Sequence, residues 1–114
     1  TEFIFSYFKA RYFPNNKKNI RFDTLQLDKR EFNGVSNFAF CEATFTKKNP
    51  SDEEKIKSVF LVIHRFRNNL FHGRKNPSTL NIYEEPFIII NQFLINFIEN
   101  TAENDSINNN RQII

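Results

Sequence analysis

The segment from Ser51 to Gly73 constrains the fold of this chain more than any other. Ser51 and Glu54 have the spacing of a capping box, in which the serine hydroxyl accepts a hydrogen bond from the Glu54 amide and the Glu54 side chain reaches back to the start of the helix. The acidic first turn also suits the positive end of the helix dipole. Gly73 can adopt the left-handed conformation that ends many helices. The sequence therefore predicts a long helix from Ser51 to about Phe71.

Three shorter elements are expected before this helix. Residues 2–12 carry apolar side chains four apart and are followed by Pro14, so we expect a helix that stops there. Apolar side chains alternate within residues 20–27, which favours a short strand or an extended connection. After the turn signal Asn33-Gly34, helical spacing returns and predicts a helix over residues 35–45.

A second long helix is expected near the end of the chain, after a loop at residues 74–84. Pro86 suits the first position of a helix, and the apolar pattern continues to about Asn100. This helix is apolar on nearly every side, whereas a surface helix of a monomer keeps one polar face. We therefore expect either the central helix of a bundle or an interface with another protein chain. Residues 101–114 are polar and rich in asparagine, and we expect a disordered tail.

The composition agrees with a helical domain. Fifteen phenylalanines and three tyrosines supply much of the core, and two glycines with four prolines are too few for a strand-and-turn architecture. The length of 114 residues suits one domain, which we assign to residues 1–100.

The single cysteine and the apolar segments indicate a compartment. Cys41 has no partner for an intramolecular disulfide, so we expect a reducing environment and a small buried side chain. No signal peptide is visible, and the longest apolar segment is shorter than the ~20 residues that span a bilayer. These features predict a cytoplasmic protein without membrane association. The net charge of +3 permits a polyanionic ligand without demanding one.

Arg67 stands out in the long helix. On a helical wheel it falls inside an apolar stripe formed by Ile56, Phe60, Ile63 and Leu70, with Val59 and Phe66 at the edge of the stripe. A buried, unpaired guanidinium is costly, so the stripe should open into a polar cleft or an anion should reach it. An arginine that extends to water, or that pairs with a glutamate of a neighbouring helix, explains the position equally well.

His72 lies five residues after Arg67, at the expected end of the helix. On an unbroken helix the two side chains point about 140° apart, so they share a site only if the helix ends there or a second copy of the chain supplies one of them. An unperturbed histidine has a pKa of ~6.5 and can transfer a proton, and an arginine fork matches a phosphate. Asn68 can hydrogen-bond the imidazole or a substrate. These groups can cleave a phosphodiester without a metal.

The segment Arg67-Asn68-Asn69-Leu70-Phe71-His72 resembles the R-x4-6-H motif of the HEPN superfamily, in which a polar residue commonly follows the arginine. Gly73 and Lys75 extend this likeness to the RNxxxHG(x)K run of many bacterial members. The resemblance covers about residues 51–100 well and the first half of the chain loosely. It implies an all-α, up-and-down bundle of four to five helices, which forms a homodimer with both motifs lining a shared cleft.

The resemblance also implies a function, that of a metal-independent endoribonuclease in a toxin–antitoxin or phage-defence system. The 2′-hydroxyl of the RNA would attack the adjacent phosphate, with His72 as general acid or base. Arg67 would stabilise charge on the phosphoryl oxygens, and Asn68 would orient the reacting groups. The expected partners are the RNA substrate, a second copy of the chain, and a cognate antitoxin or nucleotidyltransferase. No cofactor and no metal are expected.

Two alternatives stay open at this point. The chain can be a non-catalytic HEPN-like module for dimerisation or binding, or an accessory domain of a nucleotidyltransferase system. The presence of all three motif residues, Arg67, Asn68 and His72, favours the enzyme. His64 lies four residues before Asn68 and can border the same cleft, but a partly exposed structural histidine is the better interpretation. No cysteine or carboxylate cluster completes a metal site with His64 and His72.

Overall fold

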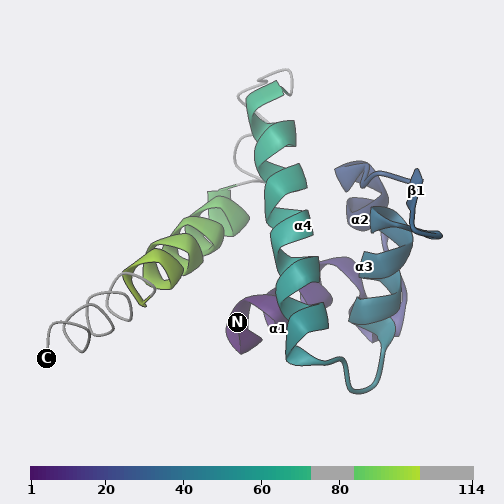
Figure 1. Ribbon diagram of the computed structural model, residues 1–114. Helices are drawn as coiled ribbons and strands as arrows, with labels where there is room; N and C mark the ends of the chain where they lie inside the picture. The colour runs from purple at the N-terminus through teal and green to yellow at the C-terminus, as the bar shows by residue number, and fades with distance from the viewer. Residues whose placement is uncertain (73–83, 101–114) are drawn as a thin grey trace, which may run out of the picture. The chain divides into compact units, whose positions relative to one another are not determined.

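The computed structural model describes residues 1–72 and 84–100, with the side chains of these residues other than Phe32, Phe71 and His72. The chain divides into two compact units, Thr1–Asn76 and Pro77–Ile114. The described part of the chain is mainly helical, with four α-helices in the first unit and one in the second (Figure 1). The predicted all-α helical bundle is thereby confirmed.

Helix α1 spans Glu2–Tyr12, as predicted. It presents four buried side chains to the core, Ile4, Phe5, Phe8 and Tyr12. A short 3₁₀ turn over Pro14–Asn16 follows, in which Asn15 and Asn16 have φ values of 57° and 62°. Asparagine tolerates this left-handed conformation better than most residues, so the polar segment after Pro14 turns the chain sharply.

Helix α2 spans Ile20–Leu25, so the predicted strand or extended connection at residues 20–27 is wrong. The Asn19 side chain caps the helix by accepting from the Phe22 amide at 3.2 Å, and it donates to the Arg11 carbonyl at 2.7 Å. Ile20 is 79% exposed, while Phe22 and Leu25 are buried three residues apart. The alternating apolar pattern seen in the sequence therefore included Ile20, whose side chain lies outside the core.

A short hairpin follows α2. Strand β1 (Glu31–Phe32) pairs antiparallel with β2 (Val35–Ser36). Between them Asn33 and Gly34 have φ values of 56° and 85°. Two successive residues in the left-handed region suit a two-residue hairpin turn, which explains why Asn-Gly occupies these positions.

Helix α3 spans Asn37–Thr46, two residues later than the predicted start at Val35. The Ser36 hydroxyl caps this helix by accepting from the Ala39 amide at 3.0 Å. Because Val35 and Ser36 belong to strand β2, the apolar spacing that suggested a helix began one element too early.

Helix α4 spans Asp52–His72, in agreement with the predicted long helix. The capping box is present: the Glu54 amide donates to the Ser51 hydroxyl at 3.2 Å, and the Ser51 amide donates to the Glu54 carboxylate at 2.8 Å. Lys47 also binds this carboxylate at 3.1 Å. The Ser51 amide and Lys47 hold the pKa of Glu54 below its usual value.

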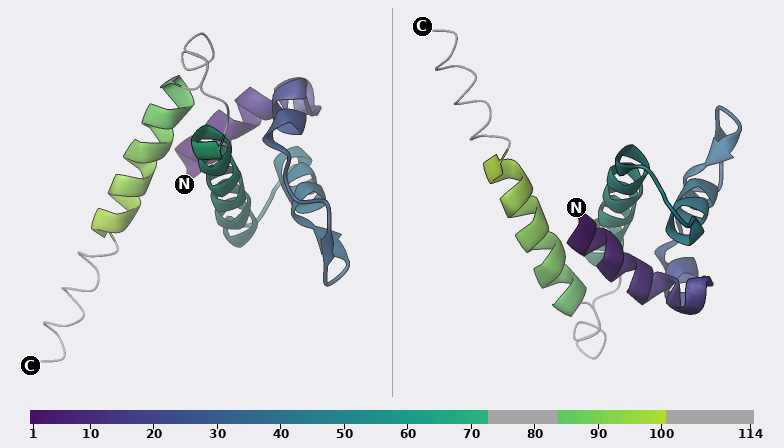
Figure 2. Two further views of the ribbon diagram at one scale, coloured as in Figure 1. Left: turned by 90° about the horizontal axis from the view of Figure 1, so that it is seen from above. Right: turned by 90° about the horizontal axis from the view of Figure 1, so that it is seen from below.

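The core of the first unit surrounds α4. Helix α3 runs antiparallel beside α4, while α1 crosses it (Figure 2). Phenylalanine rings join the other helices: Phe5 of α1 stacks on Phe45 of α3 with ring centres 4.8 Å apart, and Phe13 lies 4.6 Å from Phe22 of α2. Each such ring buries a large apolar area, as expected for a phenylalanine-rich chain.

The second unit contains one described helix, over residues 84–100, which begins two residues before Pro86. It carries five exposed large apolar side chains, Phe87, Ile88, Ile95, Phe97 and Ile98. Among the described helices none has both the length and the apolar character needed to cross a membrane. Gly73, most of the predicted loop at 74–84 and the predicted tail at 101–114 lie outside the described residues.

Candidate functional site

Arg67 is exposed on α4, and the apolar stripe in which the helical wheel placed it does not coincide with the buried side of the helix. The core-facing side of α4 is formed by Val59, Val62, Ile63 and Phe66, which are at most 4% exposed. This side is rotated by roughly 65° from the predicted stripe, with which it shares Ile63. Ile56, a member of that stripe, is 39% exposed. The Arg67 guanidinium therefore pays no desolvation cost within the core, and its position leaves it accessible to a ligand.

Asn68 forms a hydrogen bond with His64 one turn earlier on α4. The Asn68 amide nitrogen lies 3.2 Å from His64 Nε2. An amide nitrogen can only donate, so this contact suits the tautomer in which Nε2 accepts and Nδ1 carries the proton. His64, the less favoured of the two histidines in the sequence, thus contacts a motif residue directly.

His72 is the last residue of α4, four residues after Asn68. Residues four apart on a helix are neighbours on its surface, so the backbone positions of His64, Asn68 and His72 form one row along α4. The predicted role of the His72 side chain lies outside the described residues.

Asn69 has a different partner from Asn68. Its amide donates to the carbonyl of Leu25 at 3.0 Å, and the Arg65 Nε donates to the same oxygen at 2.9 Å. Leu25 is the last residue of α2, and Gln26 after it has a left-handed φ of 56°. The two α4 side chains therefore satisfy a carbonyl at the end of α2 that has no partner within its own helix.

Neither Arg65 nor Asn69 was singled out from the sequence. Their partner is a backbone oxygen 40 and 44 residues away, which no local pattern identifies. The available signal was the pair of polar side chains four apart near the buried side of α4, because such side chains need hydrogen-bond partners there.

A polar pocket of about 380 Å³ lies against this part of α4. Helix α4 contributes Leu61, His64 and Arg65 to it, and the other lining residues are Gln26, Leu27, Asp28, Arg30 and Asn37. We call it the α2–α4 pocket. His64 belongs both to this pocket and to the hydrogen bond with Asn68, so the pocket adjoins the motif.

The α2–α4 pocket carries an excess of positive charge. Arg30 binds the Asp28 carboxylate with a shortest contact of 2.8 Å. The hydrogen bonds from the Arg30 side chain and backbone lower the pKa of Asp28 to about 2, and the nearby Arg65 charge adds to this effect. Asp28 is therefore ionised at neutral pH and offsets one of the two arginines that line the pocket, Arg30 and Arg65, so these three groups leave one net positive charge.

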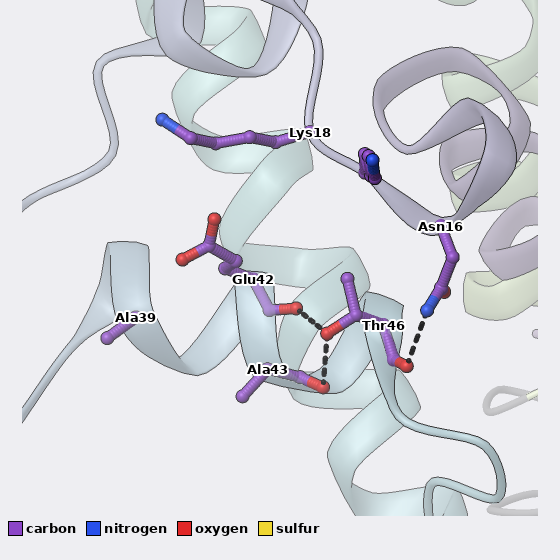
Figure 3. A pocket seen from close by; sticks show the side chains of 7 residues that line it. Asn16, Lys18, Ala39, Glu42, Ala43 and Thr46 are labelled. Atoms are coloured by element: carbon purple, nitrogen blue, oxygen red, sulfur yellow. Dashed lines mark hydrogen bonds between the residues drawn. The ribbon is translucent and has the colours of Figure 1, made fainter.

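A second hollow lies between the basic segment at Lys17 and Lys18 and helix α3. Figure 3 shows Lys18 and Glu42 on facing sides of this hollow, with Asn16 donating to the Thr46 carbonyl at 3.3 Å. Lys18 also pairs with Asp23 at 2.9 Å. Asp23 and Glu42 therefore offset the charge of Lys18 in this hollow.

Two other kinds of chemistry have no support in the described residues. The described residues contain no group of three or more histidine, cysteine, aspartate or glutamate side chains that could hold a metal ion. Cys41 is fully buried, as predicted, and burial raises the pKa of its thiol to about 12. A thiol in that state is a poor nucleophile.

No family model, curated protein or solved structure matches this chain. The likeness to the HEPN superfamily therefore depends on the motif residues and on the helical fold that carries them.

Proposed function

We propose that this chain is a metal-independent endoribonuclease of the HEPN type. The observation that carries the proposal is the arrangement on α4, where an exposed Arg67 adjoins the hydrogen-bonded pair His64 and Asn68. His72 continues the row at the end of the helix. An exposed cation beside ordered polar groups suits a phosphodiester substrate, which carries charge and needs proton transfer at defined atoms.

The proposed reaction is attack by the RNA 2′-hydroxyl on its own 3′-phosphate. A base removes the 2′-hydroxyl proton as the new P–O bond forms, and an acid protonates the 5′-oxygen as the old P–O bond breaks. The products are a 2′,3′-cyclic phosphate and a 5′-hydroxyl. We assign one of the proton transfers to His72, and Arg67 stabilises the charge on the phosphoryl oxygens. Asn68, oriented by His64, positions the reacting groups.

We further propose that the enzyme works as a homodimer in the cytoplasm. Helix α4 continues unbroken to its last residue, His72, so Arg67 and His72 begin about 140° apart on one copy. A second copy can complete the site by supplying the other member of the pair. The exposed apolar side chains of helix 84–100 are suitable for such an interface. A cognate antitoxin or nucleotidyltransferase is the expected regulatory partner.

One observation favours a non-catalytic binding module as the second candidate. Arg65 and Asn69, which flank Arg67 and Asn68, hold α2 against α4. Some of the polar residues in this part of α4 therefore have a structural role, as a binding module also requires. The structural roles of Arg65 and Asn69 are equally compatible with an accessory domain of a nucleotidyltransferase system.

Incubation of the purified protein with mixed single-stranded RNA, with and without EDTA, tests the proposal. We expect cleavage that survives EDTA and leaves 2′,3′-cyclic phosphate ends. DNA of the same sequences should resist, because it lacks the nucleophile. If the wild-type chain binds RNA but never cuts it under these conditions, the binding module replaces the enzyme.

A further inference from the structure

The α2–α4 pocket calls for an explanation of its own, because neither Arg67 nor Asn68 lines it. Its α4 residues Leu61, His64 and Arg65 are spaced so that they share one surface of the helix. The volume of about 380 Å³ is within the usual range of ~300–1,000 Å³ for small-molecule sites. The pocket can therefore hold a group the size of one nucleotide.

Arg65 is held in place for binding an anion. Its Nε donates to the Leu25 carbonyl at 2.9 Å, which fixes the plane of the guanidinium. Within residues 1–72 and 84–100 the Arg65 side chain forms no other hydrogen bond. Its two Nη groups can therefore donate to a phosphate that enters the pocket, with little further loss of side-chain freedom.

His64 adds a second donor beside Arg65. In the tautomer whose Nε2 accepts from Asn68, Nδ1 carries the proton and can donate to a ligand. Among the remaining lining residues, Gln26 and Asn37 have amide groups that can pair with the edge of a base. Leu27 and Leu61 provide apolar surface for a ring. Asp28 does not oppose an anion strongly, because Arg30 binds it.

We infer that the α2–α4 pocket binds one nucleotide of a single-stranded RNA, with its phosphate on Arg65 and His64 and its base between the amides and leucines. From there the strand passes over Asn68 to Arg67 on the same helix. The choice of RNA rests on the proposed function, whereas binding in the pocket requires no cleavage. The pocket thus selects a nucleotide next to the scissile phosphate, and His64 links it to the motif.

Fluorescence anisotropy with a labelled, fully 2′-O-methylated 12-mer tests the inference on the wild-type chain, because this RNA cannot be cut. Arg65→Gln removes the charge and keeps an amide nitrogen that can reach the Leu25 carbonyl. We expect a roughly tenfold loss of affinity and a salt dependence lower by about one phosphate contact. The matched control is Arg21→Gln, an exposed arginine on α2 outside the pocket, which should change affinity by less than about twofold.

A second pair of variants keeps the test valid if Arg65→Gln lowers stability. Leu61→Glu places a carboxylate in the pocket, and Ile56→Glu places one on the same helix outside it. Only Leu61→Glu should weaken binding beyond the general effect of charge. Equal losses for each variant and its control, or no binding of the 12-mer by wild type, would overturn the inference. Tighter binding of free nucleoside monophosphates than of the 12-mer would overturn the assignment to RNA.

Cleavage assays separate this inference from the proposed function. If the wild-type chain binds the 12-mer through Arg65 but cuts no RNA, nucleotide binding in the pocket is supported and the endoribonuclease function is excluded. If Arg65→Gln cuts RNA with an unchanged KM, the endoribonuclease function is supported and nucleotide binding by the pocket is excluded.

Discussion

The side-chain amide of Asn68 lies 3.2 Å from Nε2 of His64, whereas the neighbouring Asn69 donates to the Leu25 carbonyl at 3.0 Å. Adjacent residues on a helix point about 100° apart, so these two asparagines serve different surfaces of α4. Asn68 pairs with the exposed His64 on α4, and Asn69 belongs to the packing of α2 on α4. The motif segment therefore combines a candidate site with a structural contact.

Alanine substitutions at the two asparagines should have opposite consequences. Asn69→Ala removes a partly buried hydrogen bond and should lower the free energy of unfolding by about 1 kcal/mol, with RNA cleavage retained. Asn68→Ala removes an exposed bond, so it should change stability by less than about 0.5 kcal/mol and reduce cleavage. Urea unfolding and single-turnover cleavage measure the two effects. Equal losses of stability would show that both residues are structural.

Arg67→Ala and His72→Ala should each reduce RNA cleavage by ~10²–10⁴, the range of a lost catalytic group. Because Arg67 is exposed, its substitution should change the unfolding free energy by less than about 0.5 kcal/mol. The exposed Lys48→Ala serves as the control for charge removal outside the motif. Full activity of Arg67→Ala would remove this residue from the site.

The stabilisation from Asp28 should depend on pH in one direction. Arg30 lowers the pKa of Asp28 from 3.8 to about 2 in the folded chain, so the stabilisation is present above pH 4 and is lost as the pH falls through 2. Asp28→Asn should therefore be less stable than wild type at pH 5–7, and the difference should shrink towards pH 2. Urea unfolding across this pH range measures it. A difference that persists unchanged at pH 2 would contradict a role for the carboxylate charge.

If the chain forms a homodimer, light scattering at micromolar concentration should give a mass of about twice that of the 13.6 kDa monomer. Phe97→Glu puts a charge on the exposed apolar part of helix 84–100 and should shift the chain to a monomer. Asn96→Glu adds the same charge at an exposed polar position and should leave the dimer intact. A wild-type chain that is monomeric at these concentrations would exclude the dimer as the active form.

Cys41 should resist thiol reagents in the folded chain. Its thiol is fully buried and has a pKa raised to about 12, so few thiolates form and the reagent has no access. We expect labelling by a disulfide reagent to be at least roughly a hundredfold slower than in urea. Rapid labelling of the native protein would show that the contact between α3 and α4 opens readily.

Several elements were predictable from the sequence because their causes are local. The capping box of α4 needs only Ser51 and Glu54, three residues apart, and the turn at Asn33 and Gly34 needs only those two residues, although the strands on either side of it were not predicted. The end of α1 before Pro14 follows from the proline itself. In each case the interacting atoms belong to residues that are close together in the chain, so the local sequence is sufficient to predict the feature.

The sequence by itself thus determined the helical class, the long helix with its cap and the order of Arg67, Asn68 and His72 along it. Only the tertiary structure decided which side of α4 is buried, that Arg67 is exposed, and that residues 20–25 form a helix. It also decided that Arg65 and Asn69 share the Leu25 carbonyl. These outcomes depend on contacts between residues far apart in the chain, because a helix with apolar side chains on several sides can bury any of them until its neighbours are in place.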